Sequence, residues 1–369
     1  MSLDERAGGL LTIDLGAIAA NYQFLARTAA TGCAAVVKAD AYGLGMDRVA
    51  PALAAAGCRA FFVALADEGI ALRRLLPDAD IYILNGPPIG AEGDLVAQNL
   101  TPVLNDLDQV GRWAAAAAGR DAPLAAILHV DTGMSRLGLD GQETKRLAAE
   151  PDRLAGIDIA YLMSHLACAE EPDHPKNAEQ LAAFRAARQT LGALPGGASF
   201  ANSSGIFLGP DYRFDLVRPG AALYGVNPTP DKPNPMAQAV HLQGRILQLR
   251  DVDRPMTVGY GATHSVARKG KIITVSVGYA DGYLRSLSNR GSARIGAVPL
   301  PVLGRVSMDL ITLDASDAPD DAVRPGALVD LIGPGHDVDA LAAEAGTTGY
   351  EILTSLGPRY ARRYTDGNG

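Results

Sequence analysis

The chain has 369 residues, enough for two domains or for one large barrel with an appended domain. Apolar residues make up 48% of it and charged residues 20%, a balance typical of a globular protein with a sizeable buried core. Its formal net charge of −8 argues against nucleic acid or an anionic membrane as the main partner.

Three further features of the sequence bear on the cellular compartment and on metal binding. Three cysteines form no CxxC pair and leave any disulfide framework incomplete, so we expect a reducing, cytoplasmic compartment. We expect no secretory signal, and no uninterrupted apolar run is long enough to span a membrane. The six histidines are scattered without metal-ligand spacing, so we expect no metal site.

Between residues 10 and 225, short apolar runs alternate with alanine-rich segments of helical spacing. Alternating strands and helices predict a parallel sheet, and about eight or nine such units fit an α/β fold of the (β/α)8 TIM-barrel type. A doubly wound sheet is the competing architecture. The expected strands are 11–14, 33–37, 61–66, 81–84, 101–104, 125–131, 159–164, 198–201 and 215–217. The expected helices are 17–30, 67–76, 107–118 and 176–191.

A proline-rich stretch, NPTPDKPNP at 227–235, has no periodicity and predicts a domain boundary. We therefore expect a barrel domain at 10–235 and a separate, mainly β domain at 236–369. The strand near 10–14 is a candidate to pair with the second domain. Beyond the boundary, the expected strands are 240–250, 271–277, 293–295, 310–314 and 327–332, and the expected helices are 338–346 and 349–356.

Lys38 follows a short apolar run in the segment AAVVKADAYGLG. A lysine held at the end of a buried strand loses hydration, which lowers the pKa of its amine. A neutral amine is what Schiff-base chemistry with an aldehyde cofactor needs. This segment alone also fits a second interpretation, in which Lys38 is a strand-end lysine whose amine is exposed to water and has no catalytic role.

Polar clusters follow several of the expected strands. In a parallel barrel the active groups lie at the carboxyl ends of the strands, so these clusters share one predicted face and indicate a site. They comprise Lys38; Asp131, Thr132, Ser135 and Arg136; His165; Asn202, Ser203 and Ser204; and Arg218, Pro219 and Gly220.

The last two clusters predict a phosphate cradle. Ser203 offers a hydroxyl, and Gly220 and Ala221 offer backbone N–H groups without bulky side chains. Barrels often bind phosphate at their last two units. The segment from Asn202 to Ser204 also fits a helix cap, which needs no ligand. A phosphate site together with a lysine indicates pyridoxal 5'-phosphate (PLP).

The chain resembles the alanine racemase family, the fold-type III PLP enzymes, over nearly its whole length. The resemblance implies an N-terminal (β/α)8 barrel and a C-terminal β domain. It also implies a head-to-tail homodimer, in which the partner's C-terminal domain completes each site at a barrel mouth. It rests on the motifs VVKADAYGLG, DTGMSRLG, MSHLACAE, ANSSG, RPGAALYG, VGYGATHSV, VGYADGYLR, GRVSMDL and GYEILTSLG, which occur in this order.

By this resemblance, Lys38 matches the Schiff-base lysine and one of two bases that flank the substrate. Tyr260 matches the second base, which the family takes from the partner subunit. Without the resemblance, Tyr260 would be interpreted as a packing aromatic in a turn. His165 and Arg218 match the supporting network, and Arg218 would contact the pyridine nitrogen. Because a guanidinium cannot accept a proton, that nitrogen should stay unprotonated.

The remaining roles are also implied by the resemblance. Arg136 matches an arginine near the substrate carboxylate, and Met308 matches a residue of the partner whose backbone N–H meets the same carboxylate. Tyr279 resembles a tyrosine that narrows access to the site. The cofactor contacts implied besides Lys38 and Arg218 are Tyr42, Asn202, Ser203, Gly220, Ala221 and Tyr350.

The implied function is the PLP-dependent interconversion of L-alanine and D-alanine, for peptidoglycan synthesis or D-alanine catabolism. A serine racemase or a broad-specificity racemase of the same fold is the alternative. A non-catalytic PLP carrier would resemble only the barrel half. A decarboxylase of this fold takes a cysteine from its C-terminal domain, whereas all three cysteines here precede residue 170.

His129 departs from the pattern of many relatives. They carry at this position a lysine carbamate, whose negative charge orients the arginine that matches Arg136. Imidazole forms no stable carbamate, so another group must face Arg136. We expect a bound chloride or a carboxylate such as Asp131.

Overall fold

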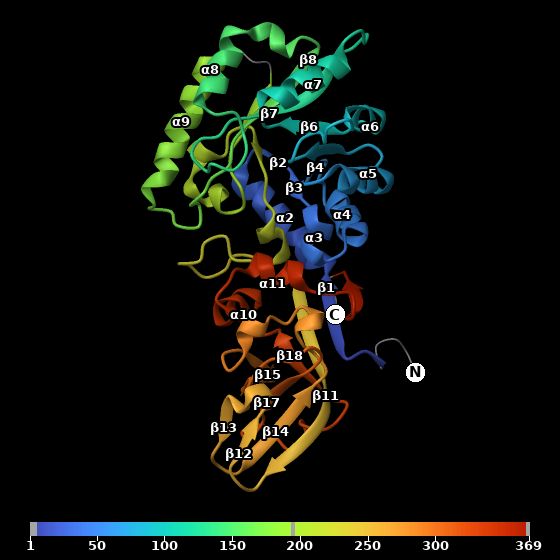
Figure 1. Ribbon diagram of the computed structural model, residues 1–369, viewed down its shortest axis with the longest axis vertical. Coiled ribbons are helices and arrows are strands. Elements are labelled where there is room, and N and C mark those ends of the chain that lie inside the picture. The colour runs from blue at the N-terminus through green and yellow to red at the C-terminus, as the bar shows by residue number, and fades with distance from the viewer. Residues whose placement is uncertain (1–5, 193–195, 367–369) are drawn as a thin grey trace.

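The computed structural model describes residues 6–192 and 196–366. Figure 1 shows an elongated molecule, with a helix-rich barrel at one end and a β-rich half at the other. Within the described residues, no helix combines the length and the apolar character needed to cross a membrane.

The barrel is a nine-stranded sheet in which every pairing is parallel. In chain order its strands are β2 (Gly32–Cys33), β3 (Ala35–Val36), β4 (Ala60–Val63), β5 (Asp80–Ile83), β6 (Thr101–Leu104), β7 (Leu124–His129), β8 (Ile157–Met163), β9 (Gly197–Ser199) and β10 (Leu216–Val217). The helices that alternate with them in the described residues are α2 (Leu15–Ala29), α4 (Met46–Ala55), α5 (Ala66–Leu75), α6 (Glu92–Ala97), α7 (Leu107–Ala117), α8 (Gly141–Ala149) and α9 (Pro175–Leu191), and the short element α3 (Lys38–Gly43) follows β3. The alternation of strands and helices predicted from the sequence is confirmed.

The single strand expected at 33–37 is wrong, because the structure divides this stretch into β2 and β3. The reason is that the two parts pair with different strands. β2 pairs with β10, the last strand, and β3 pairs with β4, the next one along the chain. One short stretch therefore joins both ends of the sheet and closes the barrel, so the doubly wound alternative is wrong. The barrel interior is filled by buried side chains from successive strands, namely Ala34, Val36, Phe62, Tyr82, Val103, Ile127, Met163 and Leu216.

Helix formation follows the spacing of apolar residues. In α2 the buried residues include Ile18, Tyr22, Leu25 and Ala29, which repeat every three or four positions and pack on the sheet. Asp14 caps the helix, because its carboxylate accepts the N–H of Ala17 at 2.8 Å.

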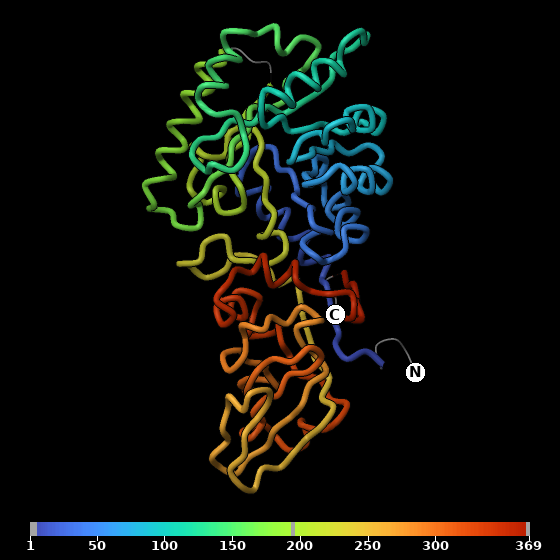
Figure 2. The backbone as a smooth tube through the Cα atoms, in the orientation of Figure 1, coloured from blue at the N-terminus to red at the C-terminus, as the bar shows by residue number. Residues whose placement is uncertain are grey.

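The second half of the chain is built on an eight-stranded sheet. β1 (Gly9–Asp14) pairs antiparallel with β11 and parallel with β19, so the N-terminal strand lies in the sheet of the C-terminal half. Figure 2 shows this strand running up into the barrel, and the segment before β11 returning from it. The other strands are β11 (Val240–Val252), β14 (Gly270–Val275), β15 (Ser292–Ile295), β16 (Val298–Pro301), β17 (Ile311–Asp314), β18 (Leu328–Ile332) and β19 (Ala361–Thr365), with helices α10 (Val338–Ala345) and α11 (Gly349–Ser355).

Several short elements of this half were not predicted. They are β16, β19 and the hairpin formed by β12 (Met256–Val258) and β13 (His264–Val266). The hairpin projects at the far end of the molecule from the barrel (Figure 1). Strands of three to five residues with mixed polarity show too little periodicity to be indicated by the sequence.

A carboxylate between two strands of this sheet makes the stability of the protein sensitive to acid. Asp330 on β18 accepts hydrogen bonds from His241 and Gln243 of β11, each at 2.8 Å. Burial alone would raise the pKa of this carboxyl, but the hydrogen bonds outweigh burial and hold the pKa below its usual range. Such a group stabilises the fold above its unfolded pKa of about 3.9, and this contribution disappears as the pH falls through the folded pKa.

We therefore expect Asp330→Asn to cost more stability at neutral pH than in acid. Urea unfolding of both proteins at pH 7 and at about pH 3 measures the difference in unfolding free energy. The gap should shrink at the lower pH, and a gap of equal size at both values would contradict this assignment.

Candidate active site

The barrel gathers the polar clusters at one mouth. Lys38 follows β3, Arg136 follows β7, His165 follows β8 and Arg218 follows β10. All the strands are parallel, so their carboxyl ends meet at the same end of the barrel. Direct contacts and mutual charge effects join Lys38, Arg136, His165 and Arg218 into one constellation.

Lys38 begins an unusual turn, α3 (Lys38–Gly43), rather than the plain loop that its sequence predicts. The four residues Ala39–Tyr42 all adopt left-handed backbone angles, with φ between 53° and 56°. Such angles cost roughly 1–2 kcal/mol for each residue that is not glycine, so the surroundings must hold the turn in place. Asp40 contributes locally, because its carboxylate accepts the N–H of Met46 at 2.7 Å.

The amine of Lys38 is partly buried at this mouth. Burial and the nearby positive charge of Arg136 lower its pKa, and the carboxylate of Glu68 opposes them. A lowered pKa increases the fraction of neutral amine at physiological pH, which is the form that attacks a carbonyl carbon.

Ser203 and the backbone after Arg218 form a small polar cradle. The Oγ atom of Ser203 accepts the N–H groups of Gly220 at 3.0 Å and of Ala222 at 3.3 Å, where the 3₁₀ turn Ala221–Tyr224 begins. The Oγ of Ser204 is buried and has no hydrogen-bond partner among the described residues. Ser203 can still donate its own O–H, and the unpaired hydroxyl of Ser204 is a second donor, so the arrangement fits a phosphate group, whose oxygens accept.

Gly220 is the position where the cradle leaves no room for a side chain. A Cβ atom there would lie 2.4 Å from the hydroxyl of Tyr42. Burial raises the pKa of Tyr42 to about 12, so its phenol stays protonated and can donate a hydrogen bond. The hydroxyl of Tyr42 therefore lies directly against the backbone of Gly220, at the edge of the cradle, where it can donate to the same ligand group.

Gly220→Ala should weaken cofactor binding, because the added methyl group displaces the Tyr42 hydroxyl. We expect the dissociation constant of PLP to rise about tenfold, the loss of one hydrogen bond to a charged group. Fluorescence titration of the cofactor-depleted protein measures it. Gly111→Ala, in the interior of α7 with open space around the new methyl, is the matched control and should leave the constant unchanged.

Two other predicted cofactor residues have partners within the protein. Asn202 caps the turn that follows it, since its Oδ1 accepts the N–H of Gly205 at 2.9 Å. Tyr350, on α11, brings the C-terminal half to the barrel mouth, with its ring centroid 6.4 Å from that of Tyr42. Its hydroxyl donates to Glu170 at 3.1 Å.

Arg218 is buried and organises the centre of the site. Its Nη1 donates to the Oγ of Ser199 at 2.5 Å, and its Nη2 donates to the carbonyl of Ser164 at 2.7 Å. Nη2 also lies 3.5 Å from Nδ1 of His165. Since a guanidinium only donates, Nδ1 of His165 is the acceptor. Burial and the charges of Arg218 and Arg136 hold the pKa of His165 well below its usual range, so this imidazole is neutral.

His129 is neutral as well. Burial and the charge of Arg218 lower its pKa to about 3, and its Nδ1 lies 2.7 Å from Oδ1 of Asn105. Both amide hydrogens of Asn105 bond to backbone carbonyls, so Oδ1 is an acceptor and Nδ1 of His129 carries the proton. This residue therefore supplies no negative charge to Arg136.

Asp131 does not supply that charge by direct contact either. Its carboxylate accepts the N–H groups of Gly133, Met134 and Ser135 at 2.9–3.1 Å, and no ion pair with Arg136 forms within the described residues. We expected either a chloride or a carboxylate such as Asp131 to face Arg136, and the carboxylate of Asp131 does not pair with it. A cavity of about 10 Å³, room for one water-sized particle, lies between these groups. It is lined by His129, Asp131, Met134, Arg136, Leu137, Ser164 and His165.

The structure does not bring Tyr260 or Met308 to Lys38 within one chain. Tyr260 lies at the tip of the β12–β13 hairpin and is 70% exposed, and Met308 is 53% exposed. Tyr279 neighbours Met308, because the N–H of Tyr279 donates to the carbonyl of Ser307 at 3.0 Å. Figure 1 places the hairpin and α3 in different halves of the molecule.

Gln180 is a site-supporting residue that sequence reasoning missed. It is fully buried on α9, and its Nε2 donates to the carbonyl of His165 at 2.9 Å and to Oγ1 of Thr132 at 3.3 Å. Its Oε1 accepts the N–H of Ala167 at 2.9 Å. One amide thus fixes the loops after β7 and β8. The sequence did offer one indication of its burial, since Gln180 lies next to the apolar residues Leu181 and Phe184 of the helix.

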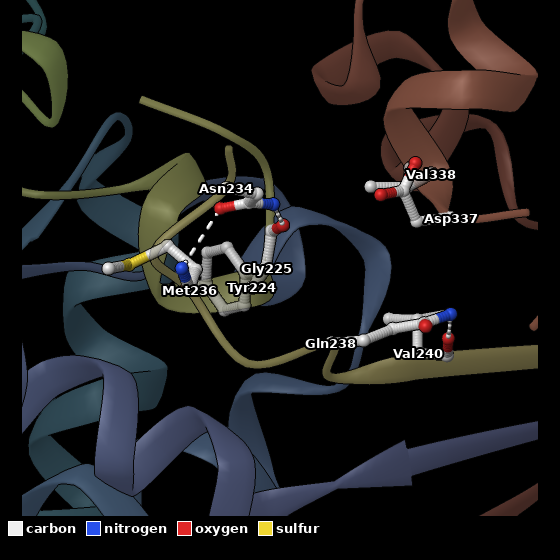
Figure 3. A pocket seen from close by; sticks show the side chains of 8 residues that line it. All are labelled: Tyr224, Gly225, Asn234, Met236, Gln238, Val240, Asp337 and Val338. Atoms are coloured by element: carbon white, nitrogen blue, oxygen red, sulfur yellow. Dashed lines mark hydrogen bonds between the residues drawn. The ribbon is translucent and has the colours of Figure 1, made fainter. Parts of the chain in front are cut away.

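A larger cavity of about 210 Å³ lies outside this constellation, between the segment that leads to β11 and the start of α10 (Figure 3). It contains none of the predicted site residues. Tyr224 forms part of its wall and packs against Tyr42, with ring centroids 4.8 Å apart and the ring planes tilted by 37°.

Comparison with known proteins identifies the family. The alanine racemase N-terminal domain model matches residues 13–228, and the C-terminal domain model matches residues 239–364. An alanine racemase from Rhodospirillum rubrum is 55% identical, over 99% of this chain and 98% of that protein. A catabolic alanine racemase from Mesorhizobium japonicum is 51% identical, over 99% of this chain and 95% of that protein.

A solved structure agrees with the sequence matches. The crystal structure of alanine racemase from Bartonella henselae, with covalently bound pyridoxal phosphate, matches with a TM-score of 0.93 at 44% identity. The match covers 97% of this chain and 99% of that one. The chain belongs to the alanine racemase family of isomerases.

Proposed function

We propose that this isomerase interconverts L-alanine and D-alanine with two bases, Lys38 of one subunit and Tyr260 of the partner subunit. The observation that carries the proposal is the arrangement of these two residues. Lys38 lies at the barrel mouth with a lowered pKa, whereas Tyr260 is exposed on a hairpin in the other half of the chain. Two bases that must flank one carbon can then meet only across two copies of the chain.

The cofactor is PLP, which when bound withdraws electrons from the α-carbon and makes its proton acidic. Lys38 holds the cofactor covalently. Ser203 and the backbone of Gly220 and Ala221 bind the phosphate, with the hydroxyl of Tyr42 beside them. The support is the polar cradle, which also contains the buried, unpaired hydroxyl of Ser204. Asn202 shapes the turn, and Tyr350 closes the site from α11.

The protons are held at two atoms, Nζ of Lys38 and Oη of Tyr260. The lowered pKa of Lys38 lets its amine accept a proton from one face of the substrate, and Tyr260 of the partner subunit donates to the other face. The phenol of Tyr260 carries an O–H that it can donate. The reverse reaction exchanges these tasks.

Arg218 and His165 set the electrostatics around the ring. Arg218 remains charged, since burial lowers its pKa only to about 9, and it cannot accept a proton from the ring nitrogen. An unprotonated ring nitrogen is a weaker electron sink, which suppresses side reactions such as transamination. His165 accepts from Arg218 and orients it.

Arg136 and Met308 of the partner subunit bind the substrate carboxylate in this proposal. Arg136 is exposed at the mouth and forms no ion pair with another described residue, so its guanidinium is available to a ligand. We also propose that a chloride ion occupies the small cavity beside Arg136, because His129 is neutral and Asp131 is engaged by its own loop. Anomalous scattering from bromide-soaked crystals tests this, and density at that position identical to water would contradict it.

A head-to-tail homodimer follows from the same arrangement. Large apolar side chains are exposed on loops of the C-terminal half, namely Tyr260, Tyr279, Met308 and Leu310. Exposed apolar patches of this kind mark interaction surfaces, and a twofold axis would place them over a second barrel mouth. The site is then complete only in the dimer.

The cellular role is either supply of D-alanine for peptidoglycan or catabolism of D-alanine. Deletion of the gene distinguishes the two, because only the first makes growth depend on added D-alanine. We place the enzyme in the cytoplasm, where free thiols persist, because Cys33, Cys58 and Cys168 are unpaired.

The experiment that tests the function is racemisation of L-alanine by the purified holoenzyme, followed by circular dichroism. L-Serine at the same concentrations tests the broader specificity, which comparable kcat/KM values would favour. Bound PLP without racemisation would indicate a carrier. Tyr260→Phe should slow α-proton exchange unequally for the two enantiomers, since it removes one base only.

A further inference from the structure

We propose that Glu68 is a positioning residue for Lys38. Its carboxylate fixes the start of the left-handed turn that follows Lys38 and so determines where the amine lies. The proposal rests on the proposed function, in which Lys38 holds the cofactor. Glu68 belongs to α5, and 29 residues separate it from Ala39, its partner in that turn.

The carboxylate of Glu68 joins two neighbouring loops at the barrel mouth. Its Oε1 accepts the N–H of Ala39 at 2.6 Å. Its Oε2 accepts the N–H groups of Ala64 at 2.8 Å and of Leu65 at 3.1 Å. Ala39 follows β3, and the other two residues follow β4, its partner in the sheet. Both carboxylate oxygens of Glu68 therefore accept backbone N–H groups. Backbone donors cannot turn away to other partners by a change of side-chain rotamer.

The turn needs such support because its conformation is unfavourable for its residues. Ala39 is the first of four left-handed residues, and none of the four is glycine. Non-glycine residues persist in this region only where neighbouring groups enforce it. At the other end of the turn, Arg362 donates to the carbonyl of Gly43 at 2.6 Å and Tyr364 to that of Leu44 at 3.0 Å. Glu68 is the anchor at the end next to Lys38.

The negative charge of Glu68 also acts on the amine of Lys38. The groups that act on the amine are Arg136, which lowers its pKa, and Glu68, which raises it. Lys38 in turn acts on His165, which lies at the same mouth. Removing the carboxylate should therefore shift the titration of Lys38 to lower pH, in addition to loosening the turn.

The test compares Glu68→Gln with Glu143→Gln. Glu143 occupies the same third position of a helix, in α8, where it accepts the N–H groups of Asp140 at 3.1 Å and of Leu107 at 3.4 Å. Both variants lose a carboxylate that caps a barrel helix, but only Glu68 touches the Lys38 turn. Two quantities are measured in the full-length protein: the dissociation constant of PLP, and the pH midpoint for acylation of Lys38 in cofactor-depleted protein, mapped by peptide mass spectrometry.

We expect Glu68→Gln to raise the dissociation constant about tenfold or more and to lower the acylation midpoint, whereas Glu143→Gln changes neither. Adding Ala39→Gly to Glu68→Gln should recover part of the PLP affinity, because glycine adopts left-handed angles without strain. If Glu68→Gln alone is insoluble, both quantities are measured on the Ala39→Gly, Glu68→Gln double variant instead. It should then still show the lowered midpoint that loss of the charge produces.

Two results overturn the proposal and can be told apart. If Glu68→Gln matches Glu143→Gln in both quantities while borohydride still traps the cofactor on Lys38, Glu68 has no positioning role and the proposed function stands. If borohydride traps the cofactor on a different lysine in the unsubstituted protein, the proposed function fails, and this inference fails with it.

Discussion

Lys38→Ala is expected to abolish racemisation, with kcat lower by about 10⁴-fold or more. The side chain performs two tasks in the proposed reaction, the covalent attachment of the cofactor and proton transfer on one face of the substrate. Removal of a proton-transfer group costs about 10²–10⁴-fold, and removal of a nucleophile up to about 10⁶-fold. The partly buried site and the lowered pKa of the amine are the physical basis of both tasks.

The measurement is the rate of D-alanine formation at saturating L-alanine, with Lys145→Ala as the control. Lys145 is an exposed lysine on α8 and should tolerate alanine without loss of rate. PLP should still bind to the Lys38→Ala protein through the phosphate cradle, but borohydride should no longer fix it to the chain. A variant that keeps more than about one hundredth of the normal kcat would exclude Lys38 as a base.

Much of the barrel was predictable because its sequence pattern is strong. Strands β4 to β8 have apolar residues in runs between helical segments, and a parallel sheet with that alternation has few topologies. The division of 32–36 into β2 and β3 was not predictable, since the residues are apolar throughout and only closure of the sheet determines their partners. In the β half, the hairpin around Tyr260 was missed because its strands have three residues each.

The site was predictable to a similar degree. Positions at strand ends follow from the order of elements, so Lys38, His165 and Arg218 could be placed at one mouth from the sequence. The left-handed turn after Lys38 had no signal, because ADAY contains no glycine and its angles are enforced from outside. Glu68 and Gln180 act through backbone contacts with residues distant in the chain, and nothing in their own segments indicates those partners.

Mixing two inactive variants should restore activity if the bases come from different subunits. In a dimer of one Lys38→Ala chain and one Tyr260→Ala chain, one site has lost both bases and the other keeps both. Half of randomly re-associated dimers are mixed, so we expect about a quarter of the normal activity. The physical basis is the position of Tyr260, 70% exposed on a hairpin in the half of the chain remote from the barrel.

The control pairs Lys38→Ala with Arg136→Ala. Both residues lie on the same barrel, after β3 and after β7, so each site of the mixed dimer carries one defect and no activity should return. The two mixtures are refolded or exchanged under identical conditions and assayed for D-alanine formation across a range of mixing ratios. Activity in the first mixture should peak at equal amounts of the two variants. Recovery in both mixtures, or in neither, would contradict a site shared between the barrel of one subunit and the hairpin of its partner.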